Sequence, residues 1–113
     1  MSDTIFMKII NKEIPSDIIH EDDQCVAFRD VNPQAPVHFL VVPRKAIPRL
    51  QDLSPEDEPL IGHIHSVITL LADKEGIAEG YRVVANSGAS AGQSVFHLHF
   101  HVLGGRPMHW PPG

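Results

Sequence analysis

Three histidines alternate with apolar residues near the end of this 113-residue chain, in the segment Phe96–Leu103. A period of two is typical of a β-strand, in which successive side chains point to opposite faces of the sheet. The pattern therefore predicts a strand over Val95–Leu103 that sends three imidazoles to one face, those of His97, His99 and His101. The opposite face is predicted to enter the core with Phe96, Leu98, Phe100 and Val102. One face of this strand is then a candidate site.

Strand-like segments outnumber helical ones in the rest of the chain, and short polar turns join them. Apolar spacing predicts a short helix over Ile5–Asn11, capped by Thr4, and a main helix that begins near Asp57 and continues through Leu71. Further strands are predicted at Ile18–His20, Cys25–Arg29, Val37–Val42 and Tyr81–Ala85. We therefore expect one α+β domain over residues 1–113, with an antiparallel sheet of about five strands, one short helix and one main helix.

Charge and cysteine content exclude several classes of protein. Nine basic and fourteen acidic residues give a formal net charge of −5, which opposes general attraction to nucleic acid or to an anionic membrane surface. The single cysteine, Cys25, cannot form an internal disulfide, and its apolar neighbours predict a packed, inert thiol. No apolar run is long enough to cross a bilayer, and no signal-peptide pattern opens the chain. These features predict a cytoplasmic protein without a nucleic-acid or membrane partner.

The alternating histidines could bind a metal ion or react as organic groups. The Cα atoms of His97 and His101 would lie about 13 Å apart at roughly 3.3 Å per residue, too far for all three imidazoles to reach one zinc ion. A pair could still bind, but no second cysteine or evident His/carboxylate cluster accompanies it, so no metal or other cofactor is expected. A neutral imidazole is a good nucleophile toward phosphorus. His99, the middle histidine, is predicted to be that nucleophile, with its other ring nitrogen held by a fixed acceptor such as a backbone carbonyl.

A glycine- and serine-rich segment, Asn86–Ser94, leads directly into the histidine strand. Small residues let backbone N–H groups converge on an anion. The segment lacks the lysine of a GxxxxGK[ST] loop and does not lead into a helix, which excludes a nucleoside-triphosphatase P-loop. We expect this loop to hold a phosphate beside His99, whereas an ordinary glycine turn would bind nothing.

The run Gln93–Leu103 resembles the histidine-triad motif, His-φ-His-φ-His-φ-φ, in which φ is apolar. Residues 3–6, 12–15 and 33–43, together with the end of the chain at 104–113, resemble the Hint branch of the histidine triad (HIT) family. The resemblance covers nearly the whole chain. It implies a HIT-like fold whose sheet continues across a homodimer. It also implies a purine nucleoside phosphoramidase, which cleaves the P–N bond between a nucleoside monophosphate such as AMP and an amine, with aminoacyl-adenylates as a second candidate substrate.

The resemblance also implies roles for individual residues. The implied catalytic residues are His38, Ser94, His97, His99 and His101. His99 is implied to carry a covalent nucleotidyl group, His101 and Ser94 to contact the phosphate or leaving group, and His38 to join the proton network. Asp30 is implied to hold the ribose hydroxyls, and further substrate contacts are Phe6, Ile9, Ile14, Phe28, Val31, Asn86, Gly92, Gln93, Phe100 and Trp110. From local sequence alone, the apolar members are equally at home in a core, Asp30 in a turn and His38 as a core histidine.

Two features of the chain bear on the branch and on the partners. Ala46 stands where animal members of the Hint branch often have a further histidine, which leaves an extended proton relay at that position unsupported. Residues 104–106 and the tail favour the Hint branch over diadenosine-polyphosphate hydrolases. The tail, 104–113, is stiffened by prolines and carries the only tryptophan, Trp110, so we expect it to reach the partner subunit's site. Two other functions remain open, a nucleotide-binding adaptor acting through protein partners and a zinc-storage protein.

Overall fold

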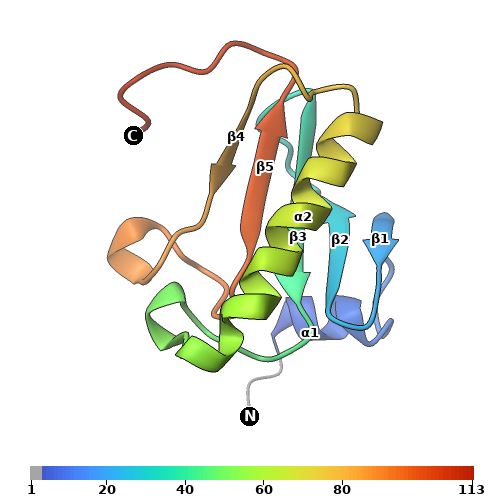
Figure 1. Cartoon of the computed structure of the whole chain (residues 1–113), viewed down its shortest axis with the longest axis vertical. Coiled ribbons are helices and arrows are strands. Elements are labelled where there is room, and N and C mark those ends of the chain that lie inside the picture. Colours follow the sequence, from blue (N-terminus) through green and yellow to red (C-terminus); the bar gives the residue numbers. More distant parts are fainter. Residues whose placement is uncertain (1–3) are drawn as a thin grey trace.

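Five antiparallel strands form one open sheet in the computed structural model, which describes residues 4–113 (Figure 1). The order across the sheet is β1-β2-β3-β5-β4. The strands are β1 Ile18–Glu21, β2 Cys25–Arg29, β3 Val37–Pro43, β4 Tyr81–Val84 and β5 Phe100–Gly104. The expected α+β fold with a five-stranded antiparallel sheet is confirmed. Asp3, part of the first segment that resembles the Hint branch, lies outside the described residues.

Two helices accompany the sheet. Helix α1, Ile5–Ile10, begins after Thr4, whose hydroxyl accepts a hydrogen bond of 3.2 Å from the Met7 N–H. Helix α2, Glu58–Lys74, follows a 3-10 turn at Pro55–Asp57. Pro59 falls in the first turn of α2, where a backbone N–H has no intrahelical acceptor, so the regular helix begins after Asp57, as predicted. No helix within residues 4–113 has both the length and the apolar character needed to cross a bilayer.

The two faces of the sheet bury different side chains. Helix α2 lies across one face (Figure 1), where it packs against residues that include Ala27, Phe39, Val41, Phe100 and Val102. Helix α1 packs on the other face against Val26, Phe28, Leu40 and Val42. Strand alternation therefore divides β5, with Phe100 and Val102 under α2 and His101 on the α1 face.

The predicted last strand begins too early. Residues 95–99 are not paired in the sheet, and β5 starts at Phe100, opposite Val41 of β3. The ladder stops there because groups of residues 97 and 98 bond to the segment after β3 instead. The Leu98 N–H donates to the Ile47 carbonyl, and the Nε2–H of His97 donates to the Pro43 carbonyl. Phe96 is 40% exposed, so its assignment to the core is wrong.

Candidate active site

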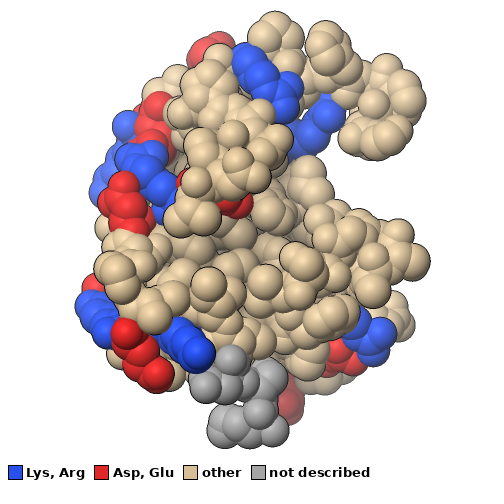
Figure 2. Space-filling view, turned by 180° about the vertical axis from the view of Figure 1, so that it is seen from behind, with Lys and Arg blue, Asp and Glu red and all other residues tan. Residues whose placement is uncertain are grey.

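A pocket of about 390 Å³ opens on the α1 face, beside the end of β2 and the loop that precedes β5. Its volume is within the range of small-molecule sites. Seen from this side, most charged side chains lie near the rim and the middle of the face is largely uncharged (Figure 2). The predicted site residues that line the pocket are Phe6, Ile9, Ile14, Phe28, Asp30, Val31, Asn86, Gly92, Ser94, His99 and His101.

His99 lines the pocket with one ring nitrogen held by the backbone. Its Nδ1 lies 2.7 Å from the His97 carbonyl oxygen. A carbonyl only accepts, so Nδ1 carries the proton and Nε2 of the neutral ring keeps its lone pair. The ring is 7% exposed and packs edge-on against Phe6, with ring centres 4.8 Å apart. Burial lowers the pKa of His99 below 6.5, although its hydrogen bond to His97 and the charge of Asp30 act in the opposite direction.

A chain of hydrogen bonds fixes His101 as the tautomer opposite to that of His99. The Gln34 backbone N–H donates to Nδ1 of His38 at 3.0 Å, so this nitrogen is an acceptor and Nε2 of the neutral His38 carries the proton. That Nε2–H is 3.0 Å from Nδ1 of His101 and donates to it. His101 must then carry its own proton on Nε2 when neutral. The pocket is therefore lined by a lone pair on His99 and an N–H on His101.

Asp30 is the acidic group beside these imidazoles. Its Oδ2 lies 3.5 Å from Nε2 of His38 and 4.0 Å from Nδ1 of His101, while Oδ1 accepts from the Asn32 N–H at 2.7 Å. Burial, and then the neighbouring imidazoles of His99 and His38, lower the pKa of His101 to about 4, although Asp30 acts in the opposite direction. Burial also lowers the pKa of His38. Both rings are neutral at physiological pH.

His97 does not line the pocket. Its side chain is 1% exposed, and its Nε2–H donates to the Pro43 carbonyl at 2.7 Å. Its Nδ1 finds no hydrogen-bond partner among residues 4–113. The ring therefore anchors the end of β3, while the His97 carbonyl holds the tautomer of His99. His97 is placed to position the site through its backbone.

The loop before β5 owes its shape to two glycines and one buried glutamine. Gly88 and Gly92 both have a φ of +97°, in the region that favours glycine. Gln93 is 4% exposed; its amide oxygen accepts from the Gly88 N–H, and its amide nitrogen donates to the carbonyls of Pro48 and Val95. Gly92 and Ser94 line the pocket, whereas the side chain of Gln93 does not line it and holds the loop in place through these hydrogen bonds.

Two further predicted contact residues lie elsewhere. The side chain of Phe100 is buried under α2, with its ring centre 5.4 Å from that of His65, and does not line the pocket, so its expected contact with substrate stays a prediction that the side-chain position does not favour. The cause is the alternation in β5, which places Phe100 opposite the histidine face. Trp110 is 82% exposed and does not line the pocket of its own chain. Its expected contact with a partner subunit stays a prediction.

Several pocket residues were not predicted from the sequence: Ile5, Pro15, Ser16, Arg29, Leu40 and Val95. Leu40 carried a usable signal, because it shares strand parity with His38. Arg29 is the one Lys or Arg in the described wall, and its guanidinium is bound to Glu75 at 2.6 and 3.0 Å. An anion in the pocket must therefore rely on backbone N–H groups and imidazoles.

A five-stranded antiparallel sheet, an alternating histidine run and a glycine-rich loop at one pocket define a histidine-triad type of protein. The chain belongs to the HIT domain family, whose model matches residues 11–108. It is 56% identical to a HIT-like protein of Synechocystis sp. over 111 residues, 98% of this chain and 97% of that protein.

Solved structures agree with this assignment. A HIT family hydrolase from Legionella pneumophila has a TM-score of 0.96 at 45% identity, covering 98% of this chain and 100% of that one. A histidine triad nucleotide-binding protein from Candida albicans has a TM-score of 0.82 at 32% identity, covering 96% and 83%. The resemblance seen in the histidine motif is thus confirmed at the level of the family.

Proposed function

We propose that this chain is a hydrolase of the Hint branch, which cleaves the P–N bond of purine nucleoside phosphoramidates and releases a nucleoside monophosphate such as AMP. The observation that carries the proposal is that the two pocket imidazoles are opposite tautomers. Nε2 of His99 has a lone pair, whereas Nε2 of His101 carries a hydrogen. A nucleophile and a hydrogen-bond donor side by side suit displacement at phosphorus, because the donor offsets the charge of the phosphate oxygens. The likeness to the hydrolase from Legionella pneumophila supports hydrolysis, and the likeness to the nucleotide-binding protein from Candida albicans supports a nucleotide ligand.

The proposed reaction has two steps. In the first, Nε2 of His99 attacks phosphorus, the P–N bond breaks, and the leaving amine takes a proton from solvent while Ser94 and the N–H of neutral His101 hydrogen-bond to the phosphate or leaving group. In the nucleotidyl-histidine, Nδ1 keeps its proton and still donates to the His97 carbonyl. The ring is therefore cationic and a good leaving group. Water then attacks phosphorus, the bond from phosphorus to Nε2 of His99 breaks, and the proton of the water is released to solvent. The nucleotide leaves and His99 is neutral again.

Substrate binding divides between two parts of the pocket. The apolar wall of Phe6, Ile9 and Phe28 suits a purine ring, with Ile14 and Val31 at its edge, and Asp30 suits the ribose hydroxyls. The phosphate would lie against the loop at Gly92 and Ser94, where backbone N–H groups offset its charge. Asn86 would complete the sugar and phosphate contacts. Aminoacyl-adenylates present the same nucleotide and differ only in the leaving group.

The direct test is turnover of a fluorogenic adenosine phosphoramidate. We expect many turnovers per active site, with AMP as the nucleotide product identified by chromatography. Ser16→Ala, which changes a pocket residue without a proposed chemical role, serves as the matched control and should retain turnover. Saturable binding without turnover would instead favour the nucleotide-binding adaptor.

We also propose a cytoplasmic homodimer in which the tail of one subunit reaches the site of the other. The exposed Trp110 and the unpaired edge of β4 are surfaces that a partner subunit would cover. Light scattering should give twice 12.5 kDa. Removing the residues after Gly105 should change the ranking of amine leaving groups in kcat/KM. An unchanged ranking in a truncated chain that is still dimeric would contradict the role of the tail.

A further inference from the structure

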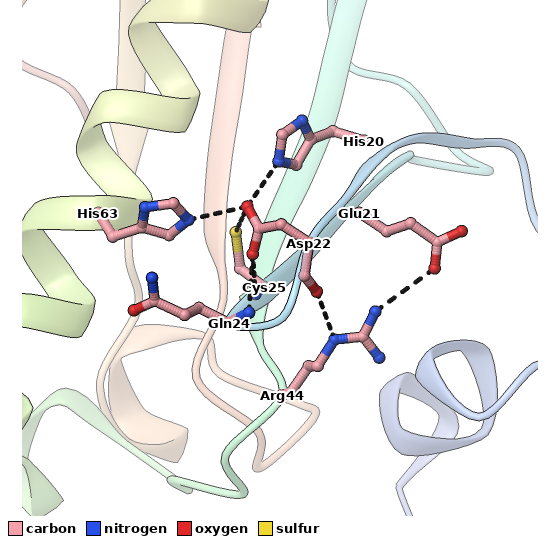
Figure 3. A network of polar contacts seen from close by, with 7 residues as sticks. All are labelled: His20, Glu21, Asp22, Gln24, Cys25, Arg44 and His63. Atoms are coloured by element: carbon pink, nitrogen blue, oxygen red, sulfur yellow. Dashed lines mark hydrogen bonds and ion pairs between the residues drawn. The ribbon is translucent and has the colours of Figure 1, made fainter.

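A second cluster of reactive side chains lies on the α2 side of the sheet, away from the pocket. It joins the turn between β1 and β2 to the middle of α2 (Figure 3). Its members are His20 on β1, Asp22 in the turn, Cys25 on β2 and His63 on α2. None of the four lines the pocket of the candidate active site, and the proposed reaction uses none of them.

One carboxylate oxygen stands at the centre of the cluster. Oδ2 of Asp22 lies 2.7 Å from Nε2 of His20, 2.8 Å from Nε2 of His63 and 3.6 Å from Sγ of Cys25 (Figure 3). The other oxygen, Oδ1, accepts from the backbone N–H groups of Gln24 and Cys25, at 2.8 Å each. A carboxylate only accepts, so two imidazoles and one thiol all direct their protons at a single oxygen. Three donors on one acceptor atom exceed what is needed to cap a turn.

We propose that this cluster is a zinc site, with four ligand atoms: His20 Nε2, Asp22 Oδ2, Cys25 Sγ and His63 Nε2. Imidazole, thiolate and carboxylate are the donors that zinc takes in proteins, and four of them complete a tetrahedral site. One thiolate and one carboxylate neutralise the charge of a divalent ion. A thiolate and two imidazoles do not suit magnesium or calcium, which prefer oxygen ligands.

The distances are close to those that zinc requires. Ligand atoms on a tetrahedral zinc ion lie about 3.3–3.6 Å apart, given bond lengths of about 2.0–2.3 Å. The contact between Cys25 and Asp22 already has this length, and the candidate atoms of His20, Asp22 and Cys25 lie within 4.8 Å of one another. The two contacts from imidazole to carboxylate are about half an ångström shorter, and they would lengthen when the ion replaces the protons. His63 lies outside this group of three but contacts Asp22 Oδ2 at 2.8 Å, so its side chain would have to move toward His20 and Cys25 to complete the set.

The surroundings allow an ion to enter and hold the ligands in place. The side chains of His20, Asp22 and His63 are 20%, 24% and 30% exposed, so solvent reaches the cluster, whereas Cys25 is fully buried beneath them. Arg44 donates from Nε to the Asp22 carbonyl at 2.7 Å and fixes the turn. Without an ion, burial and the charge of Asp22 raise the pKa of the Cys25 thiol to about 12. Zinc would displace this proton and bind the thiolate.

Cobalt substitution tests the site, because a thiolate bound to Co²⁺ gives a charge-transfer band and the chain has one cysteine. The full-length protein is stripped with EDTA, dialysed, and titrated with Co²⁺ and then Zn²⁺. We expect the charge-transfer band to saturate at one equivalent, Zn²⁺ to abolish it, and Zn²⁺ to raise the Tm. A parent chain that binds cobalt without a thiolate band would overturn the proposal, since the ion would then lie elsewhere, including at Asp30, His38 and His101 in the pocket.

Variants separate the ligands from their neighbours. His20→Gln and His63→Gln should each weaken Co²⁺ binding by more than about 100-fold, beyond the loss typical of groups that only orient a ligand. Both replace partly exposed side chains, so the fold should persist, and circular dichroism checks it. His65→Gln, an exposed histidine on the same helix, is the matched control and should bind as the parent does. His101→Ala, which removes the competing pocket histidine, should retain the band. Unchanged affinity in His20→Gln and His63→Gln would overturn the proposal. None of these measurements uses phosphoramidate turnover, so a failure of the zinc proposal and a failure of the proposed function can be told apart.

Discussion

Replacing His99 by alanine is expected to lower kcat by about three or more orders of magnitude while AMP still binds. The side chain is the proposed nucleophile, and its Nε2 lone pair is fixed because Nδ1–H donates to the His97 carbonyl. No other pocket group has a nitrogen lone pair held in this way among the described residues. The proposed phosphate contacts at Gly92 and Ser94, which line the pocket, remain in the variant, so the Kd of AMP from calorimetry should change far less than kcat.

Two further measurements sharpen this test. His101→Ala should lose less activity than His99→Ala, because a hydrogen-bond donor assists the reaction whereas a nucleophile carries it. Rapid quench of the parent with labelled adenylate substrate should place the nucleotide on a histidine, in an acid-labile linkage. Substantial turnover by His99→Ala, together with no adduct in the parent, would show that water attacks phosphorus directly.

Local sequence patterns predicted most of the fold because each strand and helix carries its own periodicity. Thr4 caps α1, and the apolar spacing after Asp57 identifies α2. The start of β5 could not be predicted in this way. It depends on the carbonyls of Pro43 and Ile47, which lie some fifty positions earlier in the chain and satisfy groups at His97 and Leu98. A local pattern contains no information about these distant acceptors.

The same limit applies to the candidate site. The histidine motif pointed to the pocket, and the family resemblance added wall residues such as Phe6 and Asp30 that periodicity alone would leave in a core or a turn. Sequence could not assign the bonding of His101, because its tautomer follows from the Gln34 N–H through His38. Alternation could have excluded Phe100, which has the opposite parity to the histidines.

The zinc proposal departs from the expectation, made from the sequence, that no metal binds. That expectation rested on the spacing of the three alternating histidines and on the absence of a second cysteine. The spacing His20-x-Asp22-x-x-Cys25 is visible in the sequence, and it brings three ligands to one hairpin turn. The fourth, His63, is 41 positions from Asp22 on a helix, and only the packing of α2 on the sheet brings it near.

Acidification from pH 7 to pH 5 is expected to destabilise this protein by several kcal/mol. Burial lowers the pKa values of four imidazoles below 6.5, namely those of His38, His97, His99 and His101. Below pH 6.5 the unfolded chain binds more protons than the folded one, so stability falls until the pH reaches each folded pKa. For His101, whose pKa is about 4, the loss at pH 5 is about 2 kcal/mol. The other three add losses of the same sign.

Urea unfolding at pH 7 and pH 5 measures this loss, and the informative quantity is the difference between the two pH values for each variant. His101→Gln should reduce that difference by about 2 kcal/mol, because glutamine does not titrate. His109→Gln, at an exposed position of the tail, is the matched control and should leave the difference unchanged.

Asp22 does not confound the comparison. Burial raises the pKa of Asp22, but hydrogen bonds from His20 and its other neighbours outweigh burial and lower the pKa below 3.8. The contribution of Asp22 to stability is therefore lost only in more acid solution. Equal losses in the parent and His101→Gln would show that His101 is not held neutral by burial. The neutral tautomer assigned to His101, in which Nδ1 accepts from His38, would then lose its physical basis.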